Sequence, residues 1–80
     1  MTNTEKLTQA FCEALMIDAS AVTNELSYQG IAEWDSISHM VLISEIEGAF
    51  EVSLETDDVI DLSSVAKAKE ILSKHGVDFN

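Results

Sequence analysis

Apolar residues recur at helical spacing in this chain, and this periodicity restricts the fold more than any other feature. In the first stretch, Leu7, Phe11 and Leu15 lie four residues apart and would share one face of a helix over about residues 4–16. No segment alternates convincingly between apolar and polar residues, although residues 50–54 would pass as a short strand. With 80 residues the chain can form one small domain around a single core, so we expect an all-α fold.

Three further helices are predicted after the first. The second begins at Asp35 or Ser36 and continues to residue 50, a short third helix covers about residues 56–60, and a fourth covers about residues 63–75. The loop of residues 18–35 is unusually long for a compact domain. Its apolar residues should anchor it to the core: Val22, Leu26, Ile31 and Trp34. The predicted core consists of Leu7, Phe11, Leu15, Leu42, Ile46, Phe50, Val59, Leu62, Val65 and Ile71.

The charge distribution excludes several classes of partner. Four lysines and no arginine stand against fifteen acidic residues, a formal charge of −11, and no cation lies between Lys6 and Lys67. Nucleic acids and anionic membranes both attract basic surfaces, so we expect neither to bind. A protein with a basic patch is the expected partner, because complementary potentials accelerate docking. The N-terminus lacks a basic region followed by an apolar stretch, so we predict no signal peptide and a cytoplasmic protein.

The predicted second helix has two apolar faces. Its core face consists of Leu42, Ile43, Ile46, Ala49 and Phe50. The opposite face consists of Ile37, Val41, Ser44 and Gly48, with Glu45 and Glu47 beside it. This face should be exposed, yet it is apolar or small, and its glycine costs about 1 kcal/mol of helix propensity relative to alanine. We predict that this face and the two glutamates form a partner-docking surface. The alternative is that these apolar residues are exposed without any binding role, as isolated apolar residues commonly are on protein surfaces.

Ser36 opens this helix, and three roles are open to a serine there. It could cap the helix, although Asp35 can do so equally well and also suits the positive end of the helix dipole. It could be a hydrolase nucleophile with His39 as its base, but Asp35 cannot orient His39 while adjoining Ser36, and no G-x-S-x-G elbow is present. We favour the third role, a hydroxyl presented to another enzyme for modification, and predict no enzyme activity.

The segment GIAEWDSISHMVLISEIEGAFEVSL, residues 30–54, resembles the signature of the acyl carrier protein family. In that family an Asp-Ser-Leu-type tripeptide opens the second helix, a Leu or Ile, a Glu and a Phe close it, and a Val-x-Ile/Leu segment follows. The long first loop, the order of four helices and the acidic composition agree with it. The resemblance covers essentially residues 1–80 and implies a single four-helix acyl-carrier-type bundle with a short third helix.

The resemblance also implies a covalent cofactor. Ser36 would carry a 4′-phosphopantetheine arm, transferred from coenzyme A by a separate magnesium-dependent phosphopantetheinyl transferase. Asp35 would orient the serine or contact the transferase, and Ile37 stands where the family usually shows an exposed leucine for docking. The thiol of the arm would hold acyl groups as thioesters and carry them between acyl-loading and acyl-transfer enzymes with basic docking patches. The acyl chain would shelter between the second and third helices, against Met40, Ile46, Val59 and Ile60.

Two departures from the family pattern bear on the pathway. Carriers of fatty acid synthesis usually bear a dense acidic face on the second helix, where this chain has only Glu45 and Glu47. Trp34 directly before Asp-Ser resembles carriers of specialised pathways, such as polyketide, peptide-type or surface-glycan synthesis. We therefore expect a monomeric carrier of a specialised pathway. The alternative function is a non-covalent acidic adaptor that binds a basic partner through Ile37 and Val41.

The remaining candidate residues are expected to be structural. Cys12 should be a small, partly buried residue, and His39 should pack under Trp34 or touch the prosthetic phosphate. His75, near the end of the fourth helix, should interact with the helix dipole. An acidic group suggests calcium but lacks the glycine and spacing of an EF-hand, so we predict no dedicated metal site. This group consists of Glu55, Asp57, Asp58 and Asp61.

Overall fold

The computed structural model describes residues 2–79, and in that range it is helical, as predicted. Its elements are α1 (Asn3–Leu15), the short 3-10 helix η1 (Ala19–Ala21), α2 (Ser36–Phe50), α3 (Thr56–Asp61) and α4 (Val65–Lys74). The alternative of a strand over residues 50–54 is wrong. Glu51 adopts a left-handed backbone (φ 52°) and Val52 N–H donates back to the Glu47 carbonyl, so the chain turns away where α2 ends.

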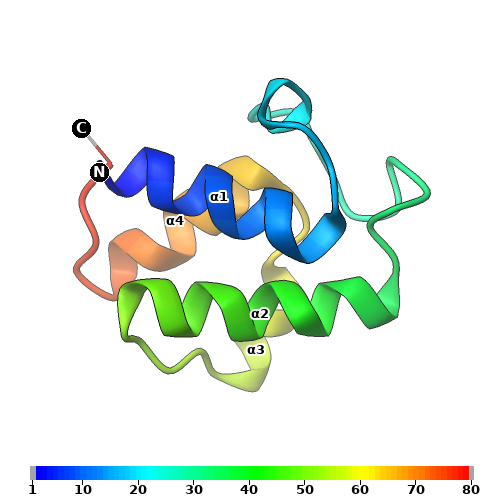
Figure 1. Cartoon of the computed structure of the whole chain (residues 1–80). Coiled ribbons are helices and arrows are strands. Elements are labelled where there is room, and N and C mark those ends of the chain that lie inside the picture. Colours follow the sequence, from blue (N-terminus) through cyan, green and yellow to red (C-terminus); the bar gives the residue numbers. More distant parts are fainter. Residues whose placement is uncertain (1, 80) are drawn as a thin grey trace.

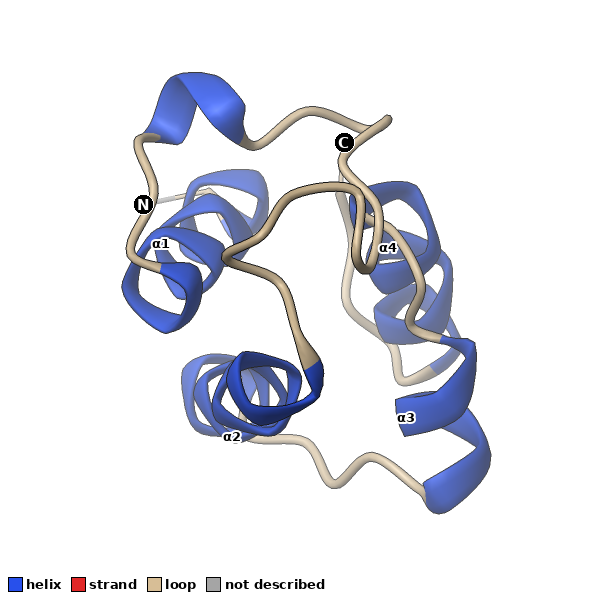
Figure 2. Cartoon of the chain, turned by 90° about the vertical axis from the view of Figure 1, so that its right-hand side faces the viewer, coloured by secondary structure: helices blue, strands red, loops and turns tan. Residues whose placement is uncertain are grey.

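The helices form two pairs around one core. Figure 1 shows α1 and α2 side by side and running in opposite directions, with α4 behind α1 and α3 behind α2. In the perpendicular view of Figure 2, the long loop between α1 and α2 crosses the space between the two pairs before it enters α2. The chain therefore reaches the N-terminus of α2 from the centre of the molecule.

The core agrees with the periodicity of the sequence. Eight of the predicted core residues are buried, namely Leu7, Phe11, Leu15, Leu42, Ile46, Leu62, Val65 and Ile71. Phe50 and Val59 are half-buried and pack against the core. Phe50 keeps some exposure because it lies near the molecular edge, where the Phe79 ring meets it at 6.0 Å and Lys6 Nζ lies 5.9 Å from its centroid.

The prediction for Ala49 is wrong. It belongs to the expected core face of α2 but is exposed, and it lines a surface groove between α1 and α2 with Lys6, Gln9 and Glu45. The buried face of α2 is therefore narrower than the sequence suggests and consists of Leu42, Ile43 and Ile46. The last turn of α2, which contains Ala49, lies at the edge of the bundle.

The long loop is fixed to the core by its apolar residues and by backbone hydrogen bonds. Trp34 is fully buried, and its ring and that of Phe11 form a T-shaped pair with a centroid distance of 5.2 Å and an interplanar angle of 78°. Leu26 is also buried, and the remaining two predicted anchors, Val22 and Ile31, are half-buried against the core. Near Leu26, the isolated antiparallel bridge between Ser27 and Ser64 joins the loop to the start of α4.

Gly76 follows the end of the last helix. Its φ of +89° is in the left-handed region, where glycine carries no steric penalty. The N–H groups of Gly76 and Val77 donate to the carbonyls of Ser73 and Leu72, which completes the hydrogen bonding of the last turn.

Candidate functional site

Two residues cap the N-terminus of α2, and neither is Ser36. Asp35 has an extended backbone, and its Oδ1 accepts from the N–H groups of Ile37 (3.1 Å) and Ser38 (2.9 Å). Ser38 Oγ accepts from Asp35 N–H (2.9 Å) and donates to the Glu33 carbonyl (2.7 Å). Hydrogen bonds from Ser38, and then from Ile37, hold the pKa of Asp35 below its usual range. The carboxylate at this helix end is thus ionised at neutral pH.

Ser36 is left without a structural task. As the first residue of α2 it is exposed, and its hydroxyl forms no hydrogen bond with any part of the chain that the structure describes. The capping role considered for Ser36 belongs to Asp35 and Ser38 instead. His39 does not serve it as a base, because both ring nitrogens of His39 have other partners.

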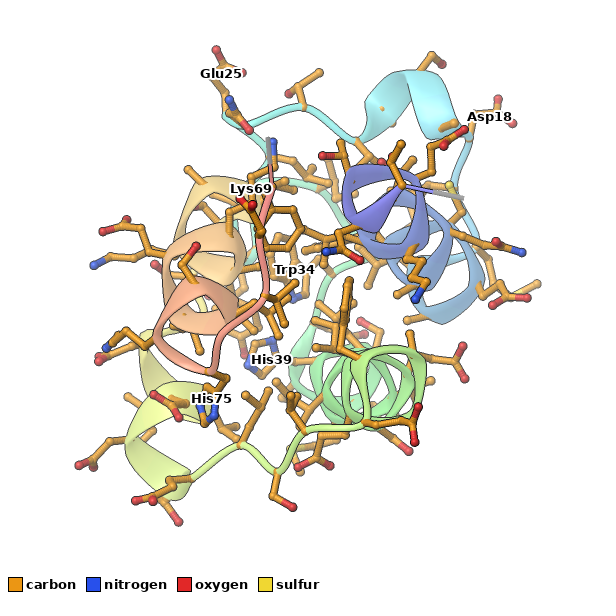
Figure 3. All side chains as sticks on the ribbon, turned by 90° about the vertical axis from the view of Figure 1, so that its left-hand side faces the viewer. Asp18, Glu25, Trp34, His39, Lys69 and His75 are labelled. Carbon is orange, nitrogen blue, oxygen red and sulfur yellow. The ribbon has the colours of Figure 1, made fainter. Side chains whose placement is uncertain are left out.

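His39 packs on Trp34, which confirms the first of the two contacts expected for it. The planes of the two rings are inclined by 23° with centroids 6.0 Å apart, and Trp34 Nε1 donates to His39 Nδ1 across 3.0 Å. His39 Nε2 lies 2.9 Å from the carbonyl oxygen of Val59 on α3. Figure 3 shows Trp34 and His39 together in the interior of the molecule. Tyr28 lies against both rings, with its centroid 5.2 Å from that of His39.

The predicted docking face of α2 is open to solvent. Ile37 is 78% exposed and Val41 is 46% exposed, and Ser44 and Gly48 are also exposed. The two flanking glutamates are half-buried and turn to different sides. Glu47 Oε2 accepts from Leu54 N–H (2.8 Å) and so holds the α2–α3 loop, whereas Glu45 lines the groove between α1 and α2. The exposed stripe itself therefore carries no carboxylate.

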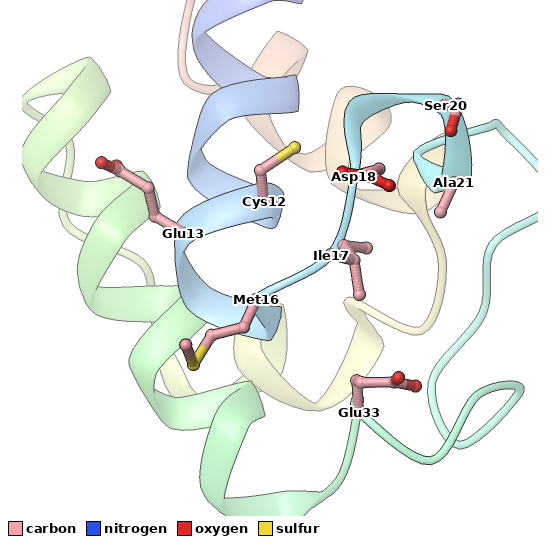
Figure 4. Close-up of a pocket in the computed structure, with 8 residues that line it drawn as sticks. All are labelled: Cys12, Glu13, Met16, Ile17, Asp18, Ser20, Ala21 and Glu33. Atoms are coloured by element: carbon pink, nitrogen blue, oxygen red, sulfur yellow. The ribbon is translucent and has the colours of Figure 1, made fainter.

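The four residues predicted to line an acyl pocket differ widely in their exposure. Met40 and Ile60 are 58% and 72% exposed, Val59 is half-buried, and Ile46 is fully buried in the core. A depression of about 740 Å³ lies beside the end of α1. Figure 4 shows the residues that line it, which include Cys12, Glu13, Asp18 and Glu33. Sequence reasoning gave no indication of this depression.

Cys12 and His75 also have defined surroundings. Cys12 is half-buried, as predicted; partial burial, followed by the negative charges of Asp18 and Glu13, raises the pKa of its thiol. The prediction for His75 is incomplete, because its Nε2 donates to Asp58 Oδ2 across 3.1 Å and joins α3 to the end of α4. Within residues 2–79, no group of His, Cys, Asp and Glu side chains is placed to hold a metal ion.

Two residues of the site were missed by the reading of the sequence. Ser38 completes the cap, and its position three residues after Asp35 is the spacing of a capping box, so a signal was present. Tyr28 packs on Trp34 and His39 from the middle of the loop. No local pattern marks Tyr28, because its contacts depend on how the loop folds over the core.

Comparison with known proteins decides the family. The family model described as "Phosphopantetheine attachment site" matches residues 5–72, most of the chain. The chain belongs to this phosphopantetheine-attachment family. The acyl carrier protein of Lactobacillus johnsonii (strain CNCM I-12250 / La1 / NCC 533) is 29% identical over 70 residues, which cover 88% of each chain. That of Rubrobacter xylanophilus (strain DSM 9941 / JCM 11954 / NBRC 16129 / PRD-1) is 28% identical over 71 residues, 89% of this chain and 88% of the relative. No solved structure matches.

Membership of the family confirms the predicted identity as an acyl carrier protein, a carrier that is not an enzyme. Its cofactor is covalently attached 4′-phosphopantetheine, and its partners include phosphopantetheinyl transferase and acyl-handling enzymes. In the described range, no helix is long and apolar enough to cross a membrane.

The surroundings of Ser36 fit such an arm. A phosphodiester needs a hydroxyl that a transferase can reach, and Ser36 offers an exposed one without a competing hydrogen bond. The arm beyond the phosphate is largely uncharged, and the exposed side chains of Ile37 and Met40 on the first two turns of α2 give it apolar surface to contact.

Proposed function

We propose that Ser36 is the attachment point of the 4′-phosphopantetheine arm and that the loaded chain carries acyl thioesters between enzymes. The observation that carries this proposal is which side chains form hydrogen bonds at the start of α2 and which one does not. Asp35 and Ser38 satisfy the first-turn donors and each other, while the Ser36 hydroxyl between them is exposed and unbonded. A serine without a structural role at the helix entry is what a modifying enzyme requires.

The attachment needs little from the carrier itself. Ser36 Oγ forms a bond to the phosphorus of the phosphopantetheine group of coenzyme A, and the phosphoanhydride bond to the 3′,5′-ADP leaving group breaks. The transferase supplies the magnesium ion and the base that takes the hydroxyl proton. The chain's contribution is placement, because a residue on the first turn of a capped helix is held in a fixed position.

The test is the intact mass of the purified chain after co-expression with a broad-specificity phosphopantetheinyl transferase. We expect one added phosphopantetheine in the wild type and none in Ser36→Ala. Ser44→Ala is the matched control, since Ser44 is exposed on the same helix, and it should accept the arm fully. No added mass in the wild type, or an added mass in Ser36→Ala, would overturn the proposal. The adaptor function, in contrast, predicts that Ser36→Ala retains full biological activity.

The pathway is more specialised than bulk fatty acid synthesis. Support comes from the exposed stripe of α2, where Ile37, Val41, Ser44 and Gly48 present no carboxylate to a partner. Glu47 is engaged with Leu54 N–H, and Glu45 faces the groove toward α1. A partner that docks here would meet an apolar surface without charges. Its basic residues would have to reach Glu45 and Glu47, which lie beside this surface.

This preference can be measured with the malonyl transferase of a fatty acid synthesis system. We expect malonylation of the holo wild type with a low kcat/KM that rises at least about tenfold in Val41→Glu/Gly48→Glu, because added carboxylates restore the complementary charge. Thr23→Glu/Ser73→Glu, which adds the same two negative charges at exposed positions outside α2, is the control for net charge alone. Efficient malonylation of the wild type, or equal gains in both double variants, would contradict the specialised pathway.

The acyl chain is proposed to enter between α2 and α3. Met40 and Ile60 stand exposed on the two helices, and the half-buried Val59 and the buried Ile46 lead from them toward the core. A longer chain would bury more apolar surface, at about 25 cal/mol per Å² removed from water. The melting temperature of the loaded carrier should therefore rise from the acetyl to the octanoyl form, and Met40→Lys should reduce that rise.

A further inference from the structure

α3 has little packing of its own, since Val59 contacts the core only as a half-buried side chain. The helix has six residues, Thr56–Asp61, and none of them is buried. Helices of this length are unstable in isolation, because forming the first turn costs more than one or two hydrogen bonds return. Contacts from outside α3 must therefore fix where it lies.

His39 on α2 makes one such contact, at the end of α3. The N–H of Ser63 would continue the helix by donating to the Val59 carbonyl, but it donates to the Asp61 carbonyl (2.7 Å) instead. The Val59 carbonyl is one of the orphan acceptors of the last turn, and His39 Nε2 lies 2.9 Å from it. The imidazole thus supplies the hydrogen bond that the helix itself does not.

Trp34 determines which nitrogen of His39 carries the proton. An indole N–H can only donate, so Nδ1, at 3.0 Å from Trp34 Nε1, must be unprotonated and accept. The proton of a neutral imidazole then lies on Nε2, where it donates to the Val59 carbonyl. The hydrogen bond from Trp34 and the contact of the Tyr28 ring hold the imidazole in this orientation. A single side chain therefore connects the loop before Asp35 to α3.

We propose that His39 is the positioning residue of α3. Through the hydrogen-bonded chain Trp34–His39–Val59 it holds α3 against the N-terminal half of α2, and loss of the bond to Val59 frees α3 without unfolding the bundle. His75 makes a second contact with α3 through Asp58, but at the surface and to a side chain. If acyl groups enter between α2 and α3, a step that rests on the proposed function, the His39–Val59 bond sets how readily the two helices separate.

Three substitutions separate the two hydrogen bonds of His39. In His39→Gln the side-chain amide can reach the place of Nε2 and donate to the Val59 carbonyl, but it has no acceptor at the place of Nδ1. In His39→Asn the Oδ1 atom can accept from Trp34 Nε1, but the shorter side chain cannot reach Val59. His39→Leu loses both bonds and keeps an apolar side chain of moderate size.

The measurement is amide hydrogen exchange in the unmodified chain by NMR, together with the indole N–H resonance of the single tryptophan. For the amides of Val59 in α3 and of Leu62, its C-cap residue, we expect exchange about tenfold faster or more in His39→Leu and His39→Asn, and within about threefold of wild type in His39→Gln. The indole resonance should stay near its wild-type position only in His39→Asn. Exchange at the α1 amide of Phe11 is the control and should change much less.

Two results would overturn the proposal. Equal exchange of Val59 in the Asn and Gln variants would show that the bond to its carbonyl does not position α3. Equal acceleration at Val59 and Phe11 would show that His39 supports the whole core and not α3. The exchange experiment needs no prosthetic group. A result against His39 would therefore not contradict the proposed attachment at Ser36, and a result against attachment would not change what the exchange rates show about His39.

Discussion

The backbone N–H of Asp35 donates to Ser38 Oγ across 2.9 Å, and the N–H of Ser38 donates back to Asp35 Oδ1 across the same distance. This reciprocal cap fixes the first turn of α2 with side chains on both sides of Ser36. Because Asp35 and Ser38 cap the helix, Ser36 can be its first residue and still present an exposed hydroxyl that can be modified.

The cap leads to a first prediction about stability. Ser38→Ala removes the hydrogen bonds to Asp35 N–H and to the Glu33 carbonyl, and should lower the free energy of unfolding by about 1 kcal/mol. Ser36→Ala removes an unbonded, exposed hydroxyl and should stay within about 0.5 kcal/mol of wild type. Urea unfolding followed by circular dichroism measures both. A larger loss in Ser36→Ala than in Ser38→Ala would contradict the assignment of roles.

Much of the fold follows from the sequence because its determinants are local. The spacing of Leu7, Phe11 and Leu15 dictates which face of α1 is buried, and a left-handed glycine at position 76 marks where α4 ends. Ser36 could be singled out for the same reason, since its motif and the helix start lie within a few residues.

The parts that could not be predicted depend on contacts between distant residues. His39 and Val59 are 20 residues apart, and nothing near either one indicates that an imidazole will complete the hydrogen bonding of α3. Ala49 fits an ideal helical wheel for the core, yet it is exposed because the buried face narrows where α2 reaches the edge of the bundle. Helix periodicity defines a face but not how much of it a neighbouring helix covers.

A second prediction concerns Gly48 on the exposed stripe of α2. A Cβ built at this position meets no atom within 4 Å, so alanine fits without a clash. Gly48→Ala should therefore raise the free energy of unfolding by about 1 kcal/mol through helix propensity alone. If Gly48 is retained for docking, the same variant should lose transfer rate with its partner enzymes although it is more stable. A destabilised Gly48→Ala would contradict the helical geometry described for this turn.

A third prediction concerns acid and the pair of Asp58 and His75. The hydrogen bond from His75 holds the pKa of Asp58 below its usual range; burial opposes this shift, and the hydrogen bond from Glu55 N–H adds to it. A carboxylate whose pKa is lowered by folding stabilises the folded state at any pH above the pKa that it has in the unfolded chain. This contribution is lost as the pH falls through the pKa of the folded state. Asp58→Asn should thus have a lower melting temperature than wild type at pH 7, and the difference should shrink toward pH 3.

Asp57→Asn is the control for this measurement. It removes the same charge from the first turn of the same helix, and its side chain is exposed. Any general relief of the chain's negative charge is therefore shared by both variants, while only Asp58→Asn removes the charged carboxylate that accepts from His75. Parallel melting curves for the two variants from pH 7 to pH 3 would show that His75 does not stabilise α3 through Asp58.

The last prediction concerns Cys12, which must not compete with the thiol of the prosthetic arm. Partial burial, then the charges of Asp18 and Glu13, raise the pKa of the Cys12 thiol, and the thiolate is the form that reacts. At pH 7.5 Cys12 should react with a disulfide reagent severalfold more slowly than a free peptide thiol. Asp18→Asn should accelerate the reaction by removing the charge with the larger effect on this pKa, whereas Glu25→Gln, on the far side of the loop, should not (Figure 3). A wild-type rate equal to that of the free thiol would mean that the carrier's own cysteine can exchange with its cargo.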